Sequence, residues 1–298
     1  MKRPPIKIRK ARRWFWLFLA PALVVYTIFW MAPIVLTAAI SLTDWKGTTA
    51  LSAAHFVGLK NYINLFSDSV LQISVRNNLI YCVLMMALVP VLSFAAAYII
   101  ENFVRRKAFF RTVAYLPAIL PTIVVVLLWK WIYNPQYGLL NQFLELIGLG
   151  NITTGWLTNS TTALWAVSFT SIWKTVPVYF VLFLAGLQAV PQDLVEASVL
   201  DGANRWQTIR HVTLPSIRPV TTIVYTLLFI DVFRVFELVY AMTDGGPGYY
   251  NTEMILTYAY KTTFTNSNAS YGMAISMILI IAVIVATAIQ LRLSRDDT

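Results

Sequence analysis

The sequence predicts an all-α protein, a polytopic membrane bundle of six transmembrane helices with both termini in the cytoplasm. Of its 298 residues, 58% are hydrophobic and only 12% are charged, whereas a soluble domain carries about 25% charged residues. The mean hydropathy is +0.66. Six apolar stretches are long enough to cross a bilayer, and the basic residues between them gather on one side. A water-exposed globule is therefore excluded.

Crossing about 30 Å of hydrocarbon takes about 20 helical residues. The predicted spans are 14–40, 79–100, 113–133, 163–187, 220–240 and 272–291. Such continuous apolar runs favour helices over barrel strands, which alternate over about ten residues. The first run is longer than the apolar core of a signal peptide and contains Trp14, Trp16 and Trp30, which suit membrane interfaces. We therefore expect this span to be retained.

The distribution of lysine and arginine predicts the orientation. Sixteen of the 23 lie in the segments 1–13, 105–111, 205–218 and 292–295, and four (Lys46, Lys60, Arg76 and Lys261) lie on the other side. Because basic residues stay in the cytoplasm, both termini are predicted inside. The net charge of +10 is then explained by the basic residues of the cytoplasmic segments, and we expect no nucleic-acid partner. The predicted organisation is a basic cytoplasmic arm, 1–13, and one transmembrane domain, 14–298.

Residues that could form a catalytic or metal centre are few. The chain has one cysteine, Cys82, and two histidines, His55 and His211, far apart in the sequence. No disulfide framework and no metal site is therefore expected, and a polytopic membrane enzyme has little support. A secondary carrier driven by an ion gradient stays open as an alternative, although the inverted repeats typical of such carriers are not evident.

The cytoplasmic loop 189–219 is predicted to contain two short helices joined at a corner. Pro191 suits a first helical turn, and Gly202 is a plausible helix stop because glycine accepts the left-handed conformation. Asn204 can cap the second helix, in which Trp206, Ile209 and Val212 recur at near-helical spacing. Two interpretations stay open: a loop lying on lipid headgroups, or a docking element for a cytoplasmic partner.

This loop also carries a family resemblance. Glu196-Ala197-Ser198, Asp201-Gly202-Ala203 and Val212-Thr213-Leu214-Pro215 resemble the EAA loop of ATP-binding-cassette (ABC) importer permeases, which reads Glu-Ala-Ala, Asp-Gly-Ala and Ile-x-Leu-Pro. Ser198 replaces the second alanine and Val212 the isoleucine. Both replacements are small and compatible with the pattern.

The resemblance extends over most of the chain. The matching segments are Ser41–Trp45, Arg76–Leu79, Leu116-Pro117, Trp129–Trp131, Asn134-Pro135, Gly138–Asn141, Ala185–Gln188 and Thr243–Pro247. This ordered series is similar to the carbohydrate-uptake permeases, the binding-protein-dependent inner-membrane components. It most resembles the larger maltose-transporter membrane subunit, in a six-span form without the large periplasmic insertion.

The resemblance implies an assembly in a bacterial or archaeal inner membrane. Its expected members are a second permease subunit, two copies of a cytoplasmic ATP-binding subunit and an extracytoplasmic solute-binding protein, with a carbohydrate as cargo and glycerol phosphate as its nearest rival. The residues implied to contact the ATPase are Glu196, Ala197, Ser198, Asp201, Gly202, Ala203, Trp206, Leu214 and Pro215. The chain has no GxxxxGK[ST] motif, so ATP and magnesium are expected in the partner subunits, with no cofactor and no catalytic residue here.

Polar residues inside the spans are candidates for the solute path. Asp231, Arg234 and Glu237 lie at i, i+3 and i+6, so on one helix Arg234 could pair with either carboxylate. They form either a self-neutralising packing anchor or a hydrogen-bonding strip. The other candidates are Trp173, Lys174, Tyr225, Phe229 and Phe233. The aromatic rings could stack on sugars or face lipid and core, and Lys174 needs a carboxylate or a watery cavity.

Overall fold

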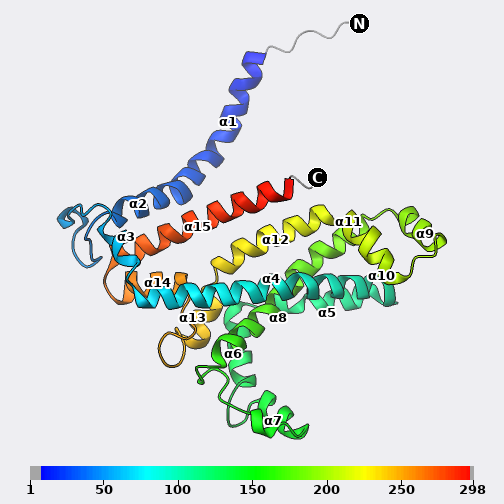
Figure 1. The fold of residues 1–298 in the computed structure, drawn as a ribbon. Coiled ribbons are helices and arrows are strands. Elements are labelled where there is room, and N and C mark those ends of the chain that lie inside the picture. The colour runs from blue at the N-terminus through cyan, green and yellow to red at the C-terminus, as the bar shows by residue number, and fades with distance from the viewer. Residues whose placement is uncertain (1–7, 296–298) are drawn as a thin grey trace. The chain divides into compact units, whose positions relative to one another are not determined.

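The structure, a computed structural model, describes residues 8–295, with side chains from 15 to 292. Within this range the regular structure is helical, with a single isolated β-bridge between Thr43 and Phe56, which confirms the all-α prediction (Figure 1). The chain forms two compact units, one of Met1–Ser67 with Ala259–Ile278 and the other of Asp68–Tyr258 with Leu279–Thr298. Residues 1–7 of the predicted basic arm lie outside the described residues.

The first unit begins with one long apolar helix. It consists of α1 (Ile8–Tyr26), a π-helical turn η1 (Thr27–Met31) and α2 (Ala32–Ser41). Its 27 residues from Phe15 to Ser41 are long and apolar enough to cross a membrane, in agreement with the first predicted span. The unit also holds η2 (Leu51–Ala53), α3 (Lys60–Leu65), η5 (Lys261–Thr265) and the first part of α15 (Ala269–Arg295).

Hydrogen bonds within the first unit hold the segment that follows α2 in its conformation. Asn61 Nδ2 donates to the carbonyls of Ser41 and Thr43, at 2.8 Å each. The Thr43 hydroxyl lies 2.9 Å from that of Ser270, and the N–H of Ser270 donates to Trp45 O at 3.0 Å. The Asn61 amide therefore satisfies carbonyls left free where the long helix ends, and Ser270 ties the following segment to the start of α15.

The second unit is built on α4 (Ser69–Phe103) and α8 (Ala163–Gln188), which lie side by side (Figure 1). The Asp68 carboxylate caps α4 by accepting the N–H groups of Val70 and Leu71, at 2.9 and 3.0 Å. Between the helices, the buried Ser93 hydroxyl donates to Val176 O at 2.9 Å. Both helices match predicted spans, although α4 starts ten residues before the predicted 79.

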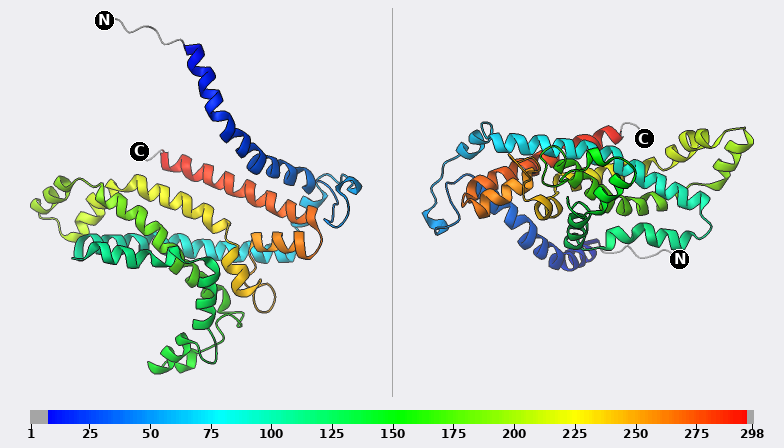
Figure 2. Two further views of the ribbon diagram at one scale, coloured as in Figure 1. Left: turned by 180° about the vertical axis from the view of Figure 1, so that it is seen from behind. Right: turned by 90° about the horizontal axis from the view of Figure 1, so that it is seen from below.

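The third predicted span, 113–133, is not one continuous helix. The chain forms α5 (Lys107–Ile119) and α6 (Thr122–Ile132), with a bend of 94° between them. Pro121 lies at the bend; it has no N–H to donate and disfavours a helical conformation of the residue before it. Figure 2 shows α6 and the following α7 (Leu139–Leu146) leaving the direction of α4 and α8.

The fifth predicted span, 220–240, is also interrupted. The helix α12 (Arg218–Phe233) ends before residues 234–236, and α13 (Glu237–Thr243) follows. The N–H of Arg234 donates to Asp231 O at 3.1 Å, a tight turn in place of the helical bond. The run Phe233–Phe236 holds aromatic and β-branched residues of weak helix propensity. After a loop comes α14 (Ile255–Tyr260), and α15 matches the sixth predicted span.

By length and composition, four helices of the described chain could cross a membrane, or up to six if each bent pair forms one span. The bent pairs are α5 with α6, and the segment Arg205–Ser216 with α12, whose bend is 72°. In the second unit, buried side chains of α4, α6, α8 and α12 form a continuous core that includes Val89, Val125, Val167 and Leu228. This packed core fixes the positions of the elements that carry the candidate sites.

Candidate functional site

Residues 189–219, here called the elbow, project from the ends of α8 and α12 (Figure 2). The elbow contains α9 (Gln192–Leu200), α10 (Arg205–Thr208), a π-helical turn η4 (Ile209–Thr213) and α11 (Leu214–Ser216). The prediction of two short helical segments joined at a corner is confirmed.

The corner of the elbow is a Schellman motif at Gly202. This residue has φ +83°, the left-handed region that glycine adopts without strain. The N–H of Ala203 donates to Ser198 O, and that of Gly202 to Val199 O, both at 3.0 Å. These two bonds satisfy the last carbonyls of α9, so the predicted helix stop at Gly202 is confirmed.

The second arm of the elbow starts with a reciprocal cap. The N–H of Gln207 donates to Asn204 Oδ1 at 3.0 Å, and the N–H of Asn204 donates to Gln207 Oε1 at 2.7 Å. The capping role of Asn204 was predicted, whereas that of Gln207 was missed. The spacing Asn-x-x-Gln is the signal that could have identified this capping box.

A pair of hydroxyl groups joins the two arms. Ser198 Oγ on α9 lies 3.1 Å from Oγ1 of Thr208 on α10, and Thr208 is buried. Ser198 Oγ also donates to Val195 O at 2.8 Å. An alanine at 198 could not make this connection. The serine that departs from the usual family pattern therefore has a structural role in this chain.

The elbow exposes large apolar side chains. Leu200 is 88% exposed and Trp206 is 66% exposed, while Leu194, Val199 and Leu214 are also exposed. Among the remaining residues predicted to contact the ATPase, Glu196, Ala197, Asp201 and Pro215 are exposed and Ala203 is half-buried. Glu196 Oε1 accepts a hydrogen bond of 2.7 Å from Gln192 Nε2. Several large exposed apolar side chains on one short segment are typical of a protein-binding site.

A charged cluster that we did not predict lies at the base of the elbow. Glu101 at the end of α4 contacts Lys107 Nζ at 2.9 Å and Arg111 Nη2 at 2.5 Å. The Arg205 guanidinium lies 5.1 Å from the centre of the Phe103 ring, within the range of a cation–π contact. The signal in the sequence is a single acidic residue at a span end that is followed by several basic residues.

The buried side chain of Ile217 lies at the bend between the elbow and α12. It is 1% exposed and belongs to the core of the second unit. Its N–H donates to Thr213 O at 3.1 Å. The elbow is thus joined to α12 through a residue that is fully enclosed by packed side chains.

The prediction that Asp231, Arg234 and Glu237 share one helix in the fifth span is wrong. Asp231 lies on α12, Arg234 in the interruption and Glu237 at the start of α13, so the three do not share a helix face. Among the side chains described, Arg234 forms no ion pair. Instead, Asp231 Oδ2 accepts a hydrogen bond of 2.8 Å from the Tyr179 hydroxyl of α8. Self-neutralisation of the triad by Arg234 is therefore not observed.

The other candidates for the solute path lie on α8 and α12. Lys174 Nζ donates to the Thr122 hydroxyl at 2.5 Å, and the Trp173 ring lies 5.6 Å from that of Trp129 in an edge-on contact. On α12 the rings of Phe229 and Phe233 lie 4.9 Å apart, and Tyr225 is half-buried. The rings of Phe229 and Phe233 thus contact each other on α12.

No group of three or more histidine, cysteine, aspartate or glutamate side chains in the part of the chain that the structure describes could hold a metal ion.

The chain is similar to membrane proteins of known class. The model of the family "Binding-protein-dependent transport system inner membrane component" matches residues 89–296. The probable ABC transporter permease protein YurN of Bacillus subtilis is 35% identical over 93% of this chain and 94% of its own length. The trehalose/maltose transport system permease protein MalF of Thermococcus litoralis is 32% identical over 97% and 96% of the two chains.

A solved structure has the same fold. It is a bacterial alginate ABC transporter in complex with an alginate pentasaccharide-bound periplasmic protein. The similar chain aligns with a TM-score of 0.84 at 21% identity, covering 98% of this chain and 97% of that chain.

Proposed function

Because the chain belongs to the family of binding-protein-dependent transport system inner membrane components, we propose that it is one of two permease subunits of an ATP-driven importer. In this proposal residues 189–219 couple the membrane helices to cytoplasmic ATPase subunits. The chain itself is the non-catalytic membrane component. ATP and magnesium are held by the partner chains, since this sequence has no phosphate-binding GxxxxGK[ST] motif.

The observation that carries the coupling role is the combination of rigidity and exposed apolar area in the elbow. Its corner is fixed by Gly202 and by the capping box of Asn204 and Gln207. At the same time Leu200 and Trp206 are largely exposed. Rigid elements can transmit the motion of a bound motor, and exposed apolar side chains of this size favour burial against a partner.

The proposed topology has six spans, with both termini and the elbow in the cytoplasm. Its support is the excess of lysine and arginine near the ends of the chain and in the segments 105–111 and 205–218. The bent pair α5–α6 then counts as one span, and α12 with the following α13 forms the fifth, since the segment Arg205–Ser216 belongs to the cytoplasmic elbow. The loops that follow α2, α6 and α13 are extracytoplasmic in this arrangement.

The proposed cargo is a saccharide delivered by an extracytoplasmic solute-binding protein. The names of the relatives support it: the Thermococcus relative is a trehalose/maltose permease, and the solved structure holds an alginate pentasaccharide on its periplasmic protein. Trp173, Lys174, Tyr225, Phe229, Asp231, Phe233, Arg234 and Glu237 are proposed for its path. Aromatic rings and polar groups together suit the two faces of a sugar ring.

The coupling proposal is tested with two matched leucines. Leu200 is the last residue of α9 and 88% exposed; Leu146 is the last residue of α7 and 83% exposed. Full burial of a leucine contributes about 1.5–3 kcal/mol, so Leu200→Ser should weaken ATPase co-purification about 10- to 100-fold. Leu146→Ser should leave it unchanged. Undiminished co-purification and ATP-driven uptake in Leu200→Ser would contradict the assigned role.

A further inference from the structure

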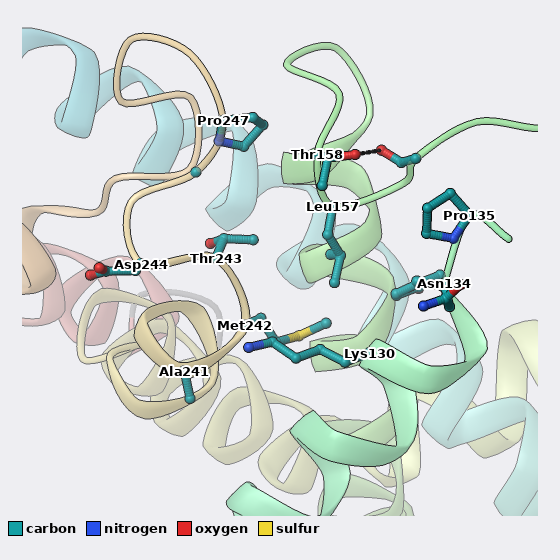
Figure 3. A pocket seen from close by; sticks show the side chains of 13 residues that line it. Lys130, Asn134, Pro135, Leu157, Thr158, Ala241, Met242, Thr243, Asp244 and Pro247 are labelled. Carbon is teal, nitrogen blue, oxygen red and sulfur yellow. Dashed lines mark hydrogen bonds between the residues drawn. The ribbon is translucent and has the colours of Figure 1, made fainter. Parts of the chain in front are cut away.

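A pocket of about 530 Å³ opens in the second unit, between the loop after α6 and the loop after α13 (Figure 3). Its lining includes Lys130, Asn134, Leu157, Thr158, Met242 and Asp244. This volume lies within the range of about 300–1,000 Å³ found for small-molecule sites. Three of the sequence segments noted above, 129–131, 134–135 and 243–247, are far apart in the chain but meet here.

The wall formed by the loop after α13 is fixed from α4. Asn77 Nδ2 donates to the carbonyls of Tyr250 and Glu253, at 2.9 and 3.0 Å. The N–H of Ile255 donates to Asn78 Oδ1 at 2.9 Å. Gly246 has φ +94°, and a Cβ there would lie 2.5 Å from Thr252 Oγ1. The loop is therefore held in one conformation by buried amides and by a close approach that only glycine permits.

The opposite wall is fixed by a second asparagine. Asn141 Nδ2 donates to the carbonyls of Pro135 and Thr154, at 3.3 and 3.1 Å. Its Oδ1 accepts from Trp156 Nε1 at 2.7 Å. Asn141 thus joins the turn after α6 to the segment that carries Leu157 and Thr158. Both walls are preorganised, which lowers the entropy cost of binding a ligand.

The lining combines a cation, a hydroxyl and apolar side chains, whereas the Asp244 carboxylate is turned away from the cavity (Figure 3). In Figure 3 the Lys130 side chain extends from α6 toward Met242, and Thr158 lies on the wall above it. Among the described side chains Lys130 makes no ion pair. A wholly apolar ligand would leave this ammonium group desolvated and unpaired. A neutral sugar has hydroxyl groups for the polar atoms and C–H faces for Leu157 and Met242.

We propose that this pocket binds one neutral sugar unit of the cargo at the extracytoplasmic mouth of the permease. The assignment rests on the proposed function, because it takes the saccharide cargo and the orientation from there. In the bound state the Lys130 ammonium donates to sugar hydroxyls. Leu157 and Met242 cover a C–H face of the ring.

Cysteine protection tests the site in the assembled importer. The chain has a single cysteine, Cys82, so Thr158→Cys in a Cys82→Ser background places one reactive thiol in the pocket wall. Glucose, maltose, trehalose and maltotriose are the probes, both for maleimide labelling and for ATP-driven uptake. We expect the sugar that is imported to slow labelling. Adding Lys130→Gln should raise the sugar concentration that gives half-maximal protection, here called the midpoint, about tenfold. This is the effect expected from losing a charge-assisted hydrogen bond.

The control is Lys60→Gln, which removes another exposed lysine, at the start of α3 in the first unit, and should leave the midpoint unchanged. If one sugar is imported but does not slow labelling, the site assignment is overturned and the proposed function stands. If none of the four sugars is imported, both the proposed saccharide cargo and the proposed sugar site are contradicted. Protection by the sugar-free binding protein alone would make the pocket a protein-docking surface and overturn the assignment.

Discussion

A substitution at Gly202, the corner of the elbow, tests how much the left-handed backbone conformation there contributes to the stability of the elbow. Gly202 has φ +83°, and a Cβ at this position would meet no atom within 4 Å. The substitution Gly202→Ala therefore adds no clash. Its cost is the left-handed conformation itself, about 1–2 kcal/mol for a residue with a side chain. A free energy of this size shifts a local opening equilibrium about 5- to 30-fold.

Gly148 provides a matched control for Gly202. It has φ +82°, a Cβ there would also meet nothing within 4 Å, and it ends α7 with the same pair of bonds, from Leu149 N to Leu144 O and from its own N to Glu145 O. Gly148→Ala carries the same strain outside the elbow. Any general effect of the substitution should therefore appear in both variants.

Hydrogen–deuterium exchange of the purified chain, followed by peptide mass spectrometry, measures the local opening. Peptides covering 192–217 should exchange about 5- to 30-fold faster in Gly202→Ala and at the wild-type rate in Gly148→Ala, with α4 and α8 unchanged in both. Gly202→Asn should lie in between, because asparagine tolerates the left-handed region. Wild-type exchange of the elbow in Gly202→Ala would refute the view that Gly202 fixes this corner.

Three further substitutions test the contacts around the candidate sites. Asn77→Ala removes one hydrogen bond to each of the carbonyls of Tyr250 and Glu253, at about 0.5–1.5 kcal/mol each, so the melting temperature should fall. Asn102→Ala, which loses one exposed bond, should stay near the wild type. Glu101→Gln removes two partly exposed ion pairs, so the melting temperature should fall only slightly and depend less on salt; unaltered salt dependence would contradict this. A Cβ at Gly186 would lie 3.0 Å from Val220 Cγ2, so Gly186→Leu should cost about 1–3 kcal/mol by overpacking, measured by thermal unfolding, and Val220→Ala should partly restore it.

Long apolar runs were enough to predict the spans that stay straight, because α4, α8 and α15 need no information beyond their own residues. The bend at Pro121 was not predicted. A proline tells where a helix is weak, but whether the chain continues or turns by 94° depends on what packs against it. The interruption at 234–236 contains neither glycine nor proline, and the weak helix propensity of its aromatic and β-branched residues is too common in membrane spans to predict a break.

The same division holds for the candidate sites. The roles of Gly202 and Asn204 were predictable, because a helix stop and a cap depend on residues only a few positions apart. Asn77 could not be assigned, since its acceptors lie 173 and 176 residues further along the chain. The triad of Asp231, Arg234 and Glu237 was misread because its spacing has meaning only on an unbroken helix. Ser198, noted only as a departure from a pattern, gained its explanation from the Thr208 hydroxyl 3.1 Å away.

The enclosed position of Ile217 has a mechanical consequence. A swivel at the root of the elbow would need a loosely packed residue, but this side chain is 1% exposed and held in the core. If α9 and α10 move, the close packing around Ile217 leaves little room for the chain to bend there. The helix α12 would therefore move together with the elbow. Close packing leaves few voids to absorb a displacement, so a movement of the elbow would be passed on to α12.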